Sequence, residues 1–239
     1  MDEQDKMQEQ SPTERPTAET ILAATCRAIV RRGIDATRIS DIAHEAGTST
    51  GTVHYYFETK EDVLLAALRW ANALPYGTID EALRVEDPAT RLARLLDFAV
   101  PYPGRPREEY VLLIELWRRI LHEPELVREG EDLSDRWRRY FFDVVRSGTE
   151  SGAFHPVAQP DVVAERLIGL ADGLSFKAVL GYRWMPPERM RTLLYDFAAE
   201  QLGVTVAELE RASSSYGRLT ASSGSRPSST ARTESTGRR

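Results

Sequence analysis

Residues 49–57, with the sequence STGTVHYYF, contain many side chains that form hydrogen bonds and no Lys, Arg, Asp or Glu. A helix that only faces solvent normally carries charged residues. Hydroxyl, imidazole and phenol groups are better suited to the phosphates and base edges of nucleic acid. The chemistry expected of this segment is therefore recognition through hydrogen bonds. The outward-facing residues would be Thr50, Gly51, Thr52, His54 and Tyr55 or Tyr56.

Short helices must position these groups. Apolar residues at helical spacing precede Gly47, whose permissive backbone allows a helix to end there. Ser49 is an N-cap candidate for a second short helix that ends near Phe57, and a third helix starts at Lys60. Together these signals predict a helix-turn-helix DNA-binding domain over residues 17–65. The apolar positions before the glycine are Ile39, Ile42, Ala43 and Ala46.

Gly51 strengthens this interpretation. A glycine in the first turn of a short helix costs about 1 kcal/mol of helix propensity. Close approach of the backbone to the wall of a DNA groove would compensate for that cost. The alternative is an ordinary, weakly stable surface helix, which each residue taken alone would favour.

The same residues match a known pattern. Residues 17–65 resemble the headpiece of the TetR family of bacterial transcriptional regulators. The resemblance implies a three-helix DNA-binding domain, a larger all-helical domain for ligand binding and dimerisation, and repression that a small molecule relieves. The matching positions are Ile42-Ala43, Ala46-Gly47, Ser49, Gly51-Thr52-Val53, Tyr55-Tyr56-Phe57, Lys60-Glu61 and Leu64.

The resemblance also extends the set of expected DNA contacts. It adds Thr37, Arg38, Ser49 and Lys60, with Lys60 and Tyr56 directed at phosphates. Two positions depart from the family pattern, because Arg38 stands where Thr is frequent and Ser40 stands where a basic residue is frequent. We therefore expect the phosphate contacts at the start of the first of the two short helices to be rearranged.

Length and charge are compatible with such a protein. The chain has 239 residues, 41% of them hydrophobic, which suffices for one small and one medium domain. Its net charge of -6 does not exclude DNA binding, since the local potential matters, but it predicts modest non-specific affinity. The only cysteine, Cys26, lies where the first helix needs an apolar residue, which fits a reducing cytoplasm and a buried position better than a redox sensor.

Both ends of the chain read as disordered. Residues 1–16 form a polar arm with five acidic and two basic residues, without the apolar run of an export signal. Residues 205–239 read as a low-complexity tail, and its Ser- and Arg-rich part from about Ala212 has five Arg against one Glu. The tail could add non-specific attraction to phosphates, although mere tolerance of such a tail is the simpler interpretation.

Residues 66–204 read as a helical ligand-binding and dimerisation domain, so the fold class is all-α. Helices are expected over 17–33, over 60–74, from 88, from near 107, from 124 to 148 or 152, and over 161–180. No apolar run approaches the ~18 residues of a membrane span. The order ELWRRILHEPEL followed by WRRYFFDVV weakly resembles the C-terminal domain of betaine-regulator-type TetR proteins.

The helix over 161–180 is apolar on more than one face, which one neighbouring helix cannot cover. Its glycines would let a second helix approach closely, and a second apolar stripe follows residues 186 and 187. We therefore expect a homodimer, whereas the alternative is a core helix beside a surface helix. The expected interface residues are Gly169, Gly173, Phe176, Leu193, Leu194 and Phe197.

Aromatic residues of the middle helices could line a cavity for a largely apolar or aromatic effector. They could equally fill the core. Glu115 and Arg118 flank Trp117 and could orient a polar group of the effector, or could simply form a salt-bridged edge. The expected ligand-binding residues are Phe98, Tyr110, Glu115, Trp117, Arg118, Trp137 and Phe141.

The sequence does not support an enzymatic function. The four His, at positions 44, 54, 122 and 155, form no His-Glu-x-x-His motif, and no phosphate loop or nucleophile elbow is present. We expect no cofactor and no metal. The sequence thus predicts a cytoplasmic, homodimeric transcriptional regulator, most simply a repressor released from a near-palindromic DNA operator by a small molecule. The alternative is a helical ligand-binding or adaptor protein whose headpiece reads no operator, which leaves the Gly51 helix unexplained.

Overall fold

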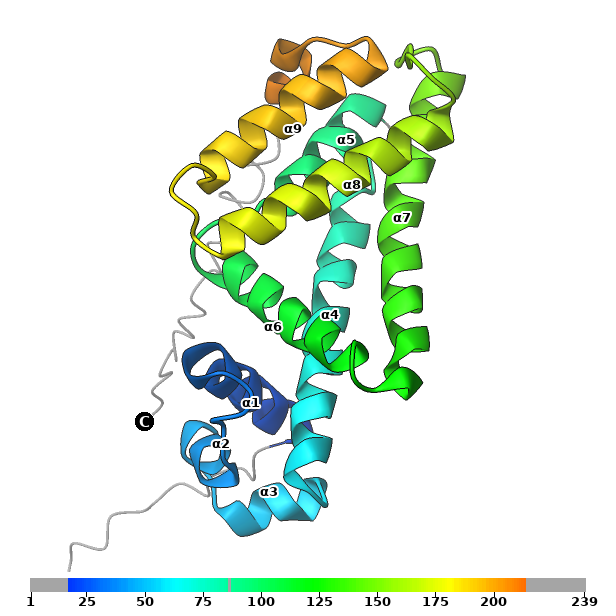
Figure 1. Cartoon of the computed structure of the whole chain (residues 1–239). Helices are drawn as coiled ribbons and strands as arrows, with labels where there is room; N and C mark the ends of the chain where they lie inside the picture. Colours follow the sequence, from blue (N-terminus) through cyan, green and yellow to red (C-terminus); the bar gives the residue numbers. More distant parts are fainter. Residues whose placement is uncertain (1–16, 86, 214–239) are drawn as a thin grey trace, which may run out of the picture. The chain divides into compact units, whose positions relative to one another are not determined.

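The computed structural model describes residues 17–85 and 87–213, and these residues form helices without any strand (Figure 1). The all-α fold class is therefore confirmed. In chain order the helices are α1 (Ala18–Arg32), α2 (Ile39–Glu45), α3 (Thr50–Tyr56), α4 (Lys60–Ala82), α5 (Pro88–Phe98), α6 (Arg105–Ile120), the 3-10 helix η1 (Pro124–Leu126), α7 (Val127–Glu150), α8 (Pro160–Val179) and α9 (Pro187–Leu202).

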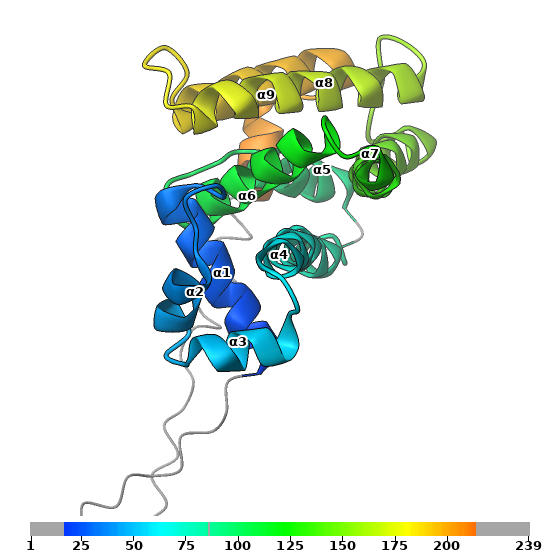
Figure 2. The same ribbon diagram turned by 60° about the horizontal axis from the view of Figure 1, so that its bottom comes forward.

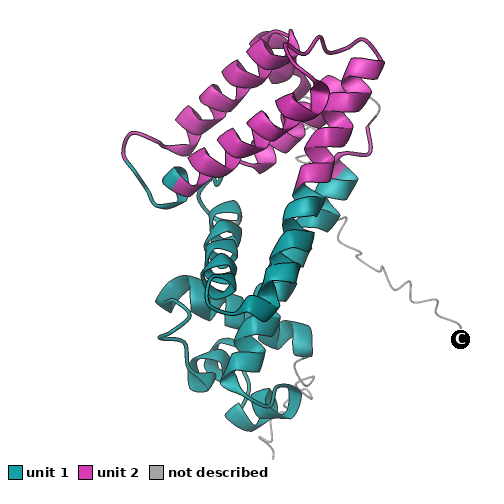
Figure 3. Ribbon diagram, turned by 45° about the vertical axis from the view of Figure 1, so that its right-hand side comes forward, with its two compact units in different colours: residues 1–81, 101–137, 177–182 teal, residues 82–100, 138–176, 183–239 magenta. Residues whose placement is uncertain are grey.

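The described residues belong to two compact units (Figure 3). The first unit is formed within residues 1–81, 101–137 and 177–182, and the second within residues 82–100, 138–176 and 183–239. The expected boundary between a headpiece and a larger domain, at residues 65 and 66, falls inside α4 and stays a prediction.

Helices α1, α2 and α3 of the first unit share a small apolar core. Its members come from all three helices and from the start of α4, and they are almost fully buried. Local signals set the helix ends: Thr17 caps α1 by accepting a hydrogen bond from the Thr20 amide, and Gly47 has the positive φ of 64° at the turn between α2 and α3. The core residues are Ile21, Ile42, Ala43, Val53 and Val63.

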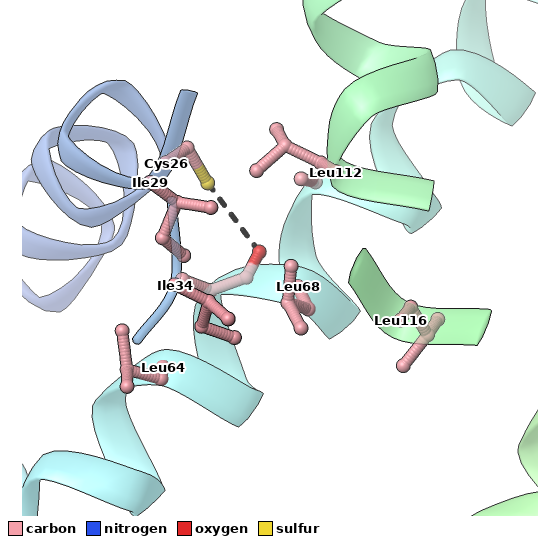
Figure 4. Packing of buried hydrophobic residues seen from close by; sticks show 9 residues of the cluster. Cys26, Ile29, Ile34, Leu64, Leu68, Leu112 and Leu116 are labelled. Carbon is pink, nitrogen blue, oxygen red and sulfur yellow. Dashed lines mark hydrogen bonds between the residues drawn. The ribbon is translucent and has the colours of Figure 1, made fainter. Parts of the chain in front are cut away.

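A second apolar cluster joins α1 to α4 and α6 (Figure 4). We call it the α1–α4–α6 cluster. The Cys26 thiol in its middle donates a hydrogen bond to the Ala67 carbonyl oxygen at 3.4 Å. Because α1 contributes to both clusters of this unit, α2 and α3 are tied through α1 to α6. The cluster consists of Cys26, Ile29, Ile34, Leu64, Ala67, Leu68, Ala71, Leu112 and Leu116.

Helix α4 also contacts the part of α7 that belongs to the first unit. The Tyr76 hydroxyl donates to the Leu133 carbonyl oxygen at 3.0 Å, and Arg136 pairs with Asp80 at 2.8 Å. The Arg136 guanidinium lies over the Tyr76 ring, 4.4 Å from its centre. These contacts fasten the second half of α4.

The second unit contains α5, α9, most of α8 and the second part of α7. Asp97 of α5 accepts hydrogen bonds from Arg191 at 2.8 Å and from the buried Tyr195 hydroxyl at 3.0 Å, which holds α9 on α5. The Phe154 ring fills the space beside Gly148 of α7, where a side chain would collide with it.

One expected boundary is wrong. Helix α4 does not stop before Pro75 but continues to Ala82. Proline removes one backbone hydrogen bond, whereas the Tyr76 hydrogen bond and the burial of Ile79 and Ala82 keep the following turns in place. The segment from 124, expected as a long but broken helical pattern, opens with η1 and continues as α7 to Glu150.

The expected disordered tail begins too early. Residues 206–213 form a helix, because Leu209 is fully buried and Thr205 and Glu208 cap the helix start reciprocally. The rest of the expected tail, and the expected arm over residues 1–16, lie outside the described residues.

The chemistry of Cys26 offers a test of the α1–α4–α6 cluster. Burial raises the pKa of the thiol to about 12, and the thiolate is the reactive form. We expect iodoacetamide at about pH 8 to leave the native protein unmodified, although a free thiol has a pKa of about 8.5. The same reagent should modify one thiol per chain in denaturant, as mass spectrometry would show. Rapid labelling of the native protein would mean that the cluster is not closed.

Candidate nucleic-acid interface and effector region

Helix α3 presents the hydrogen-bonding segment found in the sequence. Ser49 caps it, since the Thr52 amide donates to the Ser49 hydroxyl oxygen at 3.1 Å. Val53 is fully buried and anchors the inner face in the core of α1–α3. In Figures 1 and 2, α3 lies along an edge of the group formed by α1, α2 and α3. The core of α1–α3 thus holds the inner face of the helix, and its outer face is open to solvent.

The outer face of α3 is exposed and polar. Thr50, Gly51 and His54 are exposed, and Tyr55 reaches an exposed fraction of 81%. Tyr56 is 39% exposed and packs edge-on against Tyr55, with ring centres 5.2 Å apart. Aromatic rings left in water to this extent are suited to contact with another molecule.

No contact with another described residue explains the glycine at position 51. A β-carbon built there would meet only the Ser49 hydroxyl, at 3.6 Å, which is an ordinary contact. The residue has no positive φ that would favour glycine either. The described residues thus leave room for a side chain at position 51, and close approach of Gly51 to a groove stays a prediction.

Thr37 has a structural role, so its expected contact with DNA is wrong. Its side chain is fully buried, and its hydroxyl donates to the Gly33 carbonyl oxygen at 2.8 Å. This bond closes the turn between α1 and α2. The burial of Thr37 could not be predicted from the sequence, because Thr37 stands between helices where no periodic pattern operates.

Arg38 and the arginines of α1 differ in whether their guanidinium groups already form ion pairs. Arg27 and Arg31 both pair with Glu45, and Arg32 pairs with Asp41. Arg38 caps α2 through its backbone amide, which donates to Asp41 at 3.0 Å. Its exposed guanidinium has no partner among the described residues and is available for a phosphate.

Lys60 stands at the start of α4 with its ammonium group hydrogen-bonded to the Asp35 carbonyl oxygen at 3.3 Å. An ammonium group has three donors, so two remain for a phosphate. The phosphate contacts of Lys60 and Tyr56 stay predictions.

The expected ligand-binding residues are divided between the two units. Phe98 and Phe141 belong to the second unit, and Phe141 is fully buried there. The other five, on α6 and α7, belong to the first unit. Trp117 is 39% exposed. Their role in binding stays a prediction.

Arg118 and Glu115 form the salt-bridged edge that was the alternative to ligand binding. The Arg118 guanidinium donates to Glu115 at 3.1 Å and to Asp35 at 3.2 Å. These hydrogen bonds, first the one to Glu115, raise the pKa of Arg118 above its ordinary value. The Arg118 side chain is therefore already engaged with the turn between α1 and α2.

The expected dimer residues of α8 lie on one exposed face. A β-carbon at Gly169 or Gly173 would meet nothing within 4 Å, and Phe176 on the same face is 38% exposed. On α9, Leu193 and Phe197 are partly buried. Leu194 is fully buried in its own protomer, so its expected contact with a second copy is wrong. Its place in the stripe reflects packing inside the second unit.

A polar cleft of about 200 Å³ in the first unit was missed by sequence reasoning. It is formed by the turn after α1, the start of α4 and the end of α6. Charges at helix ends are common, and no spacing rule links these three segments. The lining residues are Ile34, Asp35, Lys60, Glu61, Leu64, Arg118, Arg119, His122 and Glu123.

Two further observations limit the chemistry of the described residues. Within 17–85 and 87–213, no three His, Cys, Asp or Glu side chains gather in a way that could hold a metal ion. No helix in this part of the chain is long and apolar enough to span a bilayer.

Two family models match the chain. The model for bacterial regulatory proteins of the tetR family matches residues 21–67, which include α2 and α3. The model for the C-terminal part of BetI-type transcriptional repressors matches residues 88–203.

Similar proteins cover most of the chain. The transcriptional regulator PksA of Bacillus subtilis is 30% identical over 165 residues, which are 67% of this chain and 77% of PksA. The regulator BetI of Cronobacter sakazakii is 29% identical over 185 residues, 76% of this chain and 89% of BetI. A transcriptional regulator from Saccharomonospora viridis, whose crystal structure contains choline, is 34% identical with a TM-score of 0.72, covering 77% of this chain and 96% of that one.

The roles of Lys60 and His54 predict different binding defects. Lys60→Ala should weaken binding to all DNA sequences and reduce the slope of log affinity against log salt by about one unit, because one phosphate contact is lost. His54→Ala should change the preferred base at one operator position, at a cost of about 1–3 kcal/mol. Binding-site selection combined with salt titration would check both.

Binding-site selection can also refute base contacts by α3. It would do so if substitutions at Thr50, Thr52 and His54 all selected the same DNA motif as the unchanged protein. Thr37→Val is a matched control, because the Thr37 side chain is buried and should affect stability rather than sequence preference.

Proposed function

This chain belongs to the TetR family of bacterial transcriptional regulators, and we propose that it acts as a homodimeric repressor that binds a near-palindromic operator through α3 of each copy. Proteins of this family are regulators, and a small-molecule ligand releases the repressor from its operator. The single observation that carries the proposed role of α3 is its capped, exposed polar face around Gly51, a glycine that no contact among the described residues requires.

The proposed function requires the protein to meet DNA, which in a bacterium means the cytoplasm. The competing possibility is a helical ligand-binding or adaptor protein whose headpiece reads no operator. A gel-shift assay with DNA from upstream of its own gene separates the two. The adaptor predicts no shift that survives excess unspecific DNA, whereas the repressor predicts a shift that an effector reverses.

The proposed dimer surface is the exposed face of α8 with the partly buried residues of α9. Gly169 and Gly173 leave that face flat, since they present no side chain and a β-carbon at either position would meet no described atom within 4 Å. Flat helix faces bring two helices close together, and the apolar Val162 and Phe176, each 38% exposed, would be covered by the contact. Two half-sites of an operator require such a two-fold arrangement.

Gly173→Leu tests this surface. The added side chain should overpack the helix crossing at a cost of about 1–3 kcal/mol and shift the protein toward monomer in sedimentation. Operator affinity should fall with the dimer, because two linked headpieces bind far more tightly than one. Gly77→Leu is the matched control, since Gly77 also lies in a helix and touches nothing. An intact dimer for Gly173→Leu that still binds the operator would remove α8 from the interface.

The proposed effector is a small organic molecule that is bound mainly by apolar and aromatic side chains. The first unit offers Tyr76 on α4, Tyr110 and Trp117 on α6, and Trp137 on α7. One of these rings already accepts a cation, because Arg136 lies over Tyr76. Aromatic rings bind quaternary ammonium groups in the same way, and the similar regulator from Saccharomonospora viridis was solved with choline. Choline-like cations are therefore the first compounds to test.

Thermal-shift measurements can separate the positive charge of such an effector from its shape. Choline and its neutral tert-butyl analogue have nearly the same shape, so only a cation–π site prefers choline. A stronger shift with choline supports a quaternary ammonium effector, and equal shifts support a purely apolar site. Shifts with neither direct the search to larger aromatic compounds.

Trp117→Ala should alter the response to an effector found in this way and leave effector-free operator binding nearly unchanged. A release of DNA requires unequal affinity for two states, and a coupling of about 1–3 kcal/mol would be ordinary. A normal response in Trp117→Ala, or loss of DNA binding without effector, would show that Trp117 belongs to the core.

A further inference from the structure

The polar cleft in the first unit is lined by an arginine, Arg119, one of whose donors makes no hydrogen bond. Arg119 donates through Nε and Nη2 to Glu123 at 2.6 and 3.0 Å. Its third nitrogen, Nη1, is buried and forms an ion pair with a Glu61 carboxylate oxygen at 3.3 Å, but this contact lacks hydrogen-bond geometry. The Arg119 side chain is only 12% exposed. A buried charged donor without a well-aligned acceptor is costly, so an acceptor that is better placed than Glu61 would be stabilised in the cleft.

Three further groups around the cleft carry or can carry positive charge. Lys60 has two ammonium donors left after its bond to Asp35, and Arg118 and His122 line the same space. The cleft also includes the first turn of the 23-residue helix α4, where the helix dipole favours an anion. Donor-only side chains and a helix start together suit an oxyanion.

The carboxylates at the cleft do not prevent this. The Glu123 carboxylate accepts hydrogen bonds from Nε and Nη2 of Arg119, so its charge is already compensated. Asp35 and Glu61 are 89% and 66% exposed, and ion pairs of such exposed groups contribute little stability. Both can turn toward solvent when a competing anion takes their place.

The volume limits the size of the ligand. Drug-sized ligands occupy pockets of about 300–1,000 Å³, whereas this cleft has about 200 Å³. At about 30 Å³ for each water molecule, it has room for about six waters. A phosphate group or a small carboxylate fits this space, and ordered water is the competing occupant.

We propose that this cleft is an anion-binding site, distinct from the effector region, that takes a compact oxyanion such as a phosphate group or a carboxylate on Arg119, Lys60 and Arg118. Binding replaces the Glu61 and Asp35 carboxylates as acceptors. It therefore loosens the ion pairs that join α6 to the start of α4 and to the turn after α1. The anion is either free phosphate or the acidic group of a small metabolite.

Isothermal titration calorimetry at constant ionic strength tests the site directly, without DNA or an effector. The probes are inorganic phosphate, glycerol phosphate and acetate, each balanced against chloride. We expect saturable binding with one ion per chain. Preference for inorganic phosphate indicates the free ion, and preference for glycerol phosphate or acetate indicates an ester or a carboxylate.

The substitutions should act in opposite directions. Arg119→Gln should abolish binding, whereas Glu61→Gln should strengthen it about two- to fivefold by removing the competing carboxylate. Arg69→Gln and Glu129→Gln are matched controls, because that ion pair of the same unit lies outside the cleft, and both should bind as the unchanged protein does. Circular dichroism verifies the fold of Arg119→Gln, and Glu61→Gln tests the site independently at an exposed position.

Absence of saturable binding with all three probes would leave water as the occupant and overturn the proposal. Equal losses of anion affinity in Arg119→Gln and Arg69→Gln would also overturn the proposal, since they would reflect only the general loss of positive charge. So would a Glu61→Gln variant that binds no more tightly than the unchanged protein.

Discussion

The position of α1 between two apolar clusters is the constraint on which the rest of the first unit depends. Ile21 of α1 is buried with α2 and α3, whereas Cys26 and Ile29 of the same helix are buried with α4 and α6. Truncating a buried leucine in such a cluster costs about 2–5 kcal/mol. Helix α3 therefore cannot tilt independently of α6 without opening one of the two clusters.

This packing decides which interactions can carry a signal toward the DNA-binding face. The exposed ion pair of Arg118 with Asp35 contributes at most about 1 kcal/mol. The pair of the largely buried Arg119 with the exposed Glu61 lacks hydrogen-bond geometry. The α1–α4–α6 cluster is larger and apolar, so it holds α1 against α4 and α6. The ion pairs are the part that a bound anion or a change in salt can adjust.

Local signals in the sequence were sufficient for the helix-turn-helix. The signals come from Ser49, Gly47 and the buried Val53, which act on neighbours within four residues. The structure that they favour therefore does not depend on distant parts of the chain. The same local reasoning failed at Pro75, where contacts with Leu133 sustain the helix. It also failed at Leu194, whose burial depends on the interior of the second unit.

The sequence by itself determined the all-α class, the family, most helix boundaries and the polar face of α3, because caps, turns and periodicity are properties of short segments. Only the tertiary structure decided which side chains of α6 meet the headpiece. Arg118 and Asp35 are 83 positions apart, and nothing in their spacing predicts the contact. It arises because the apolar face of α6 is buried against α1 and α4, which leaves its charged end beside the turn after α1 and forms the polar cleft.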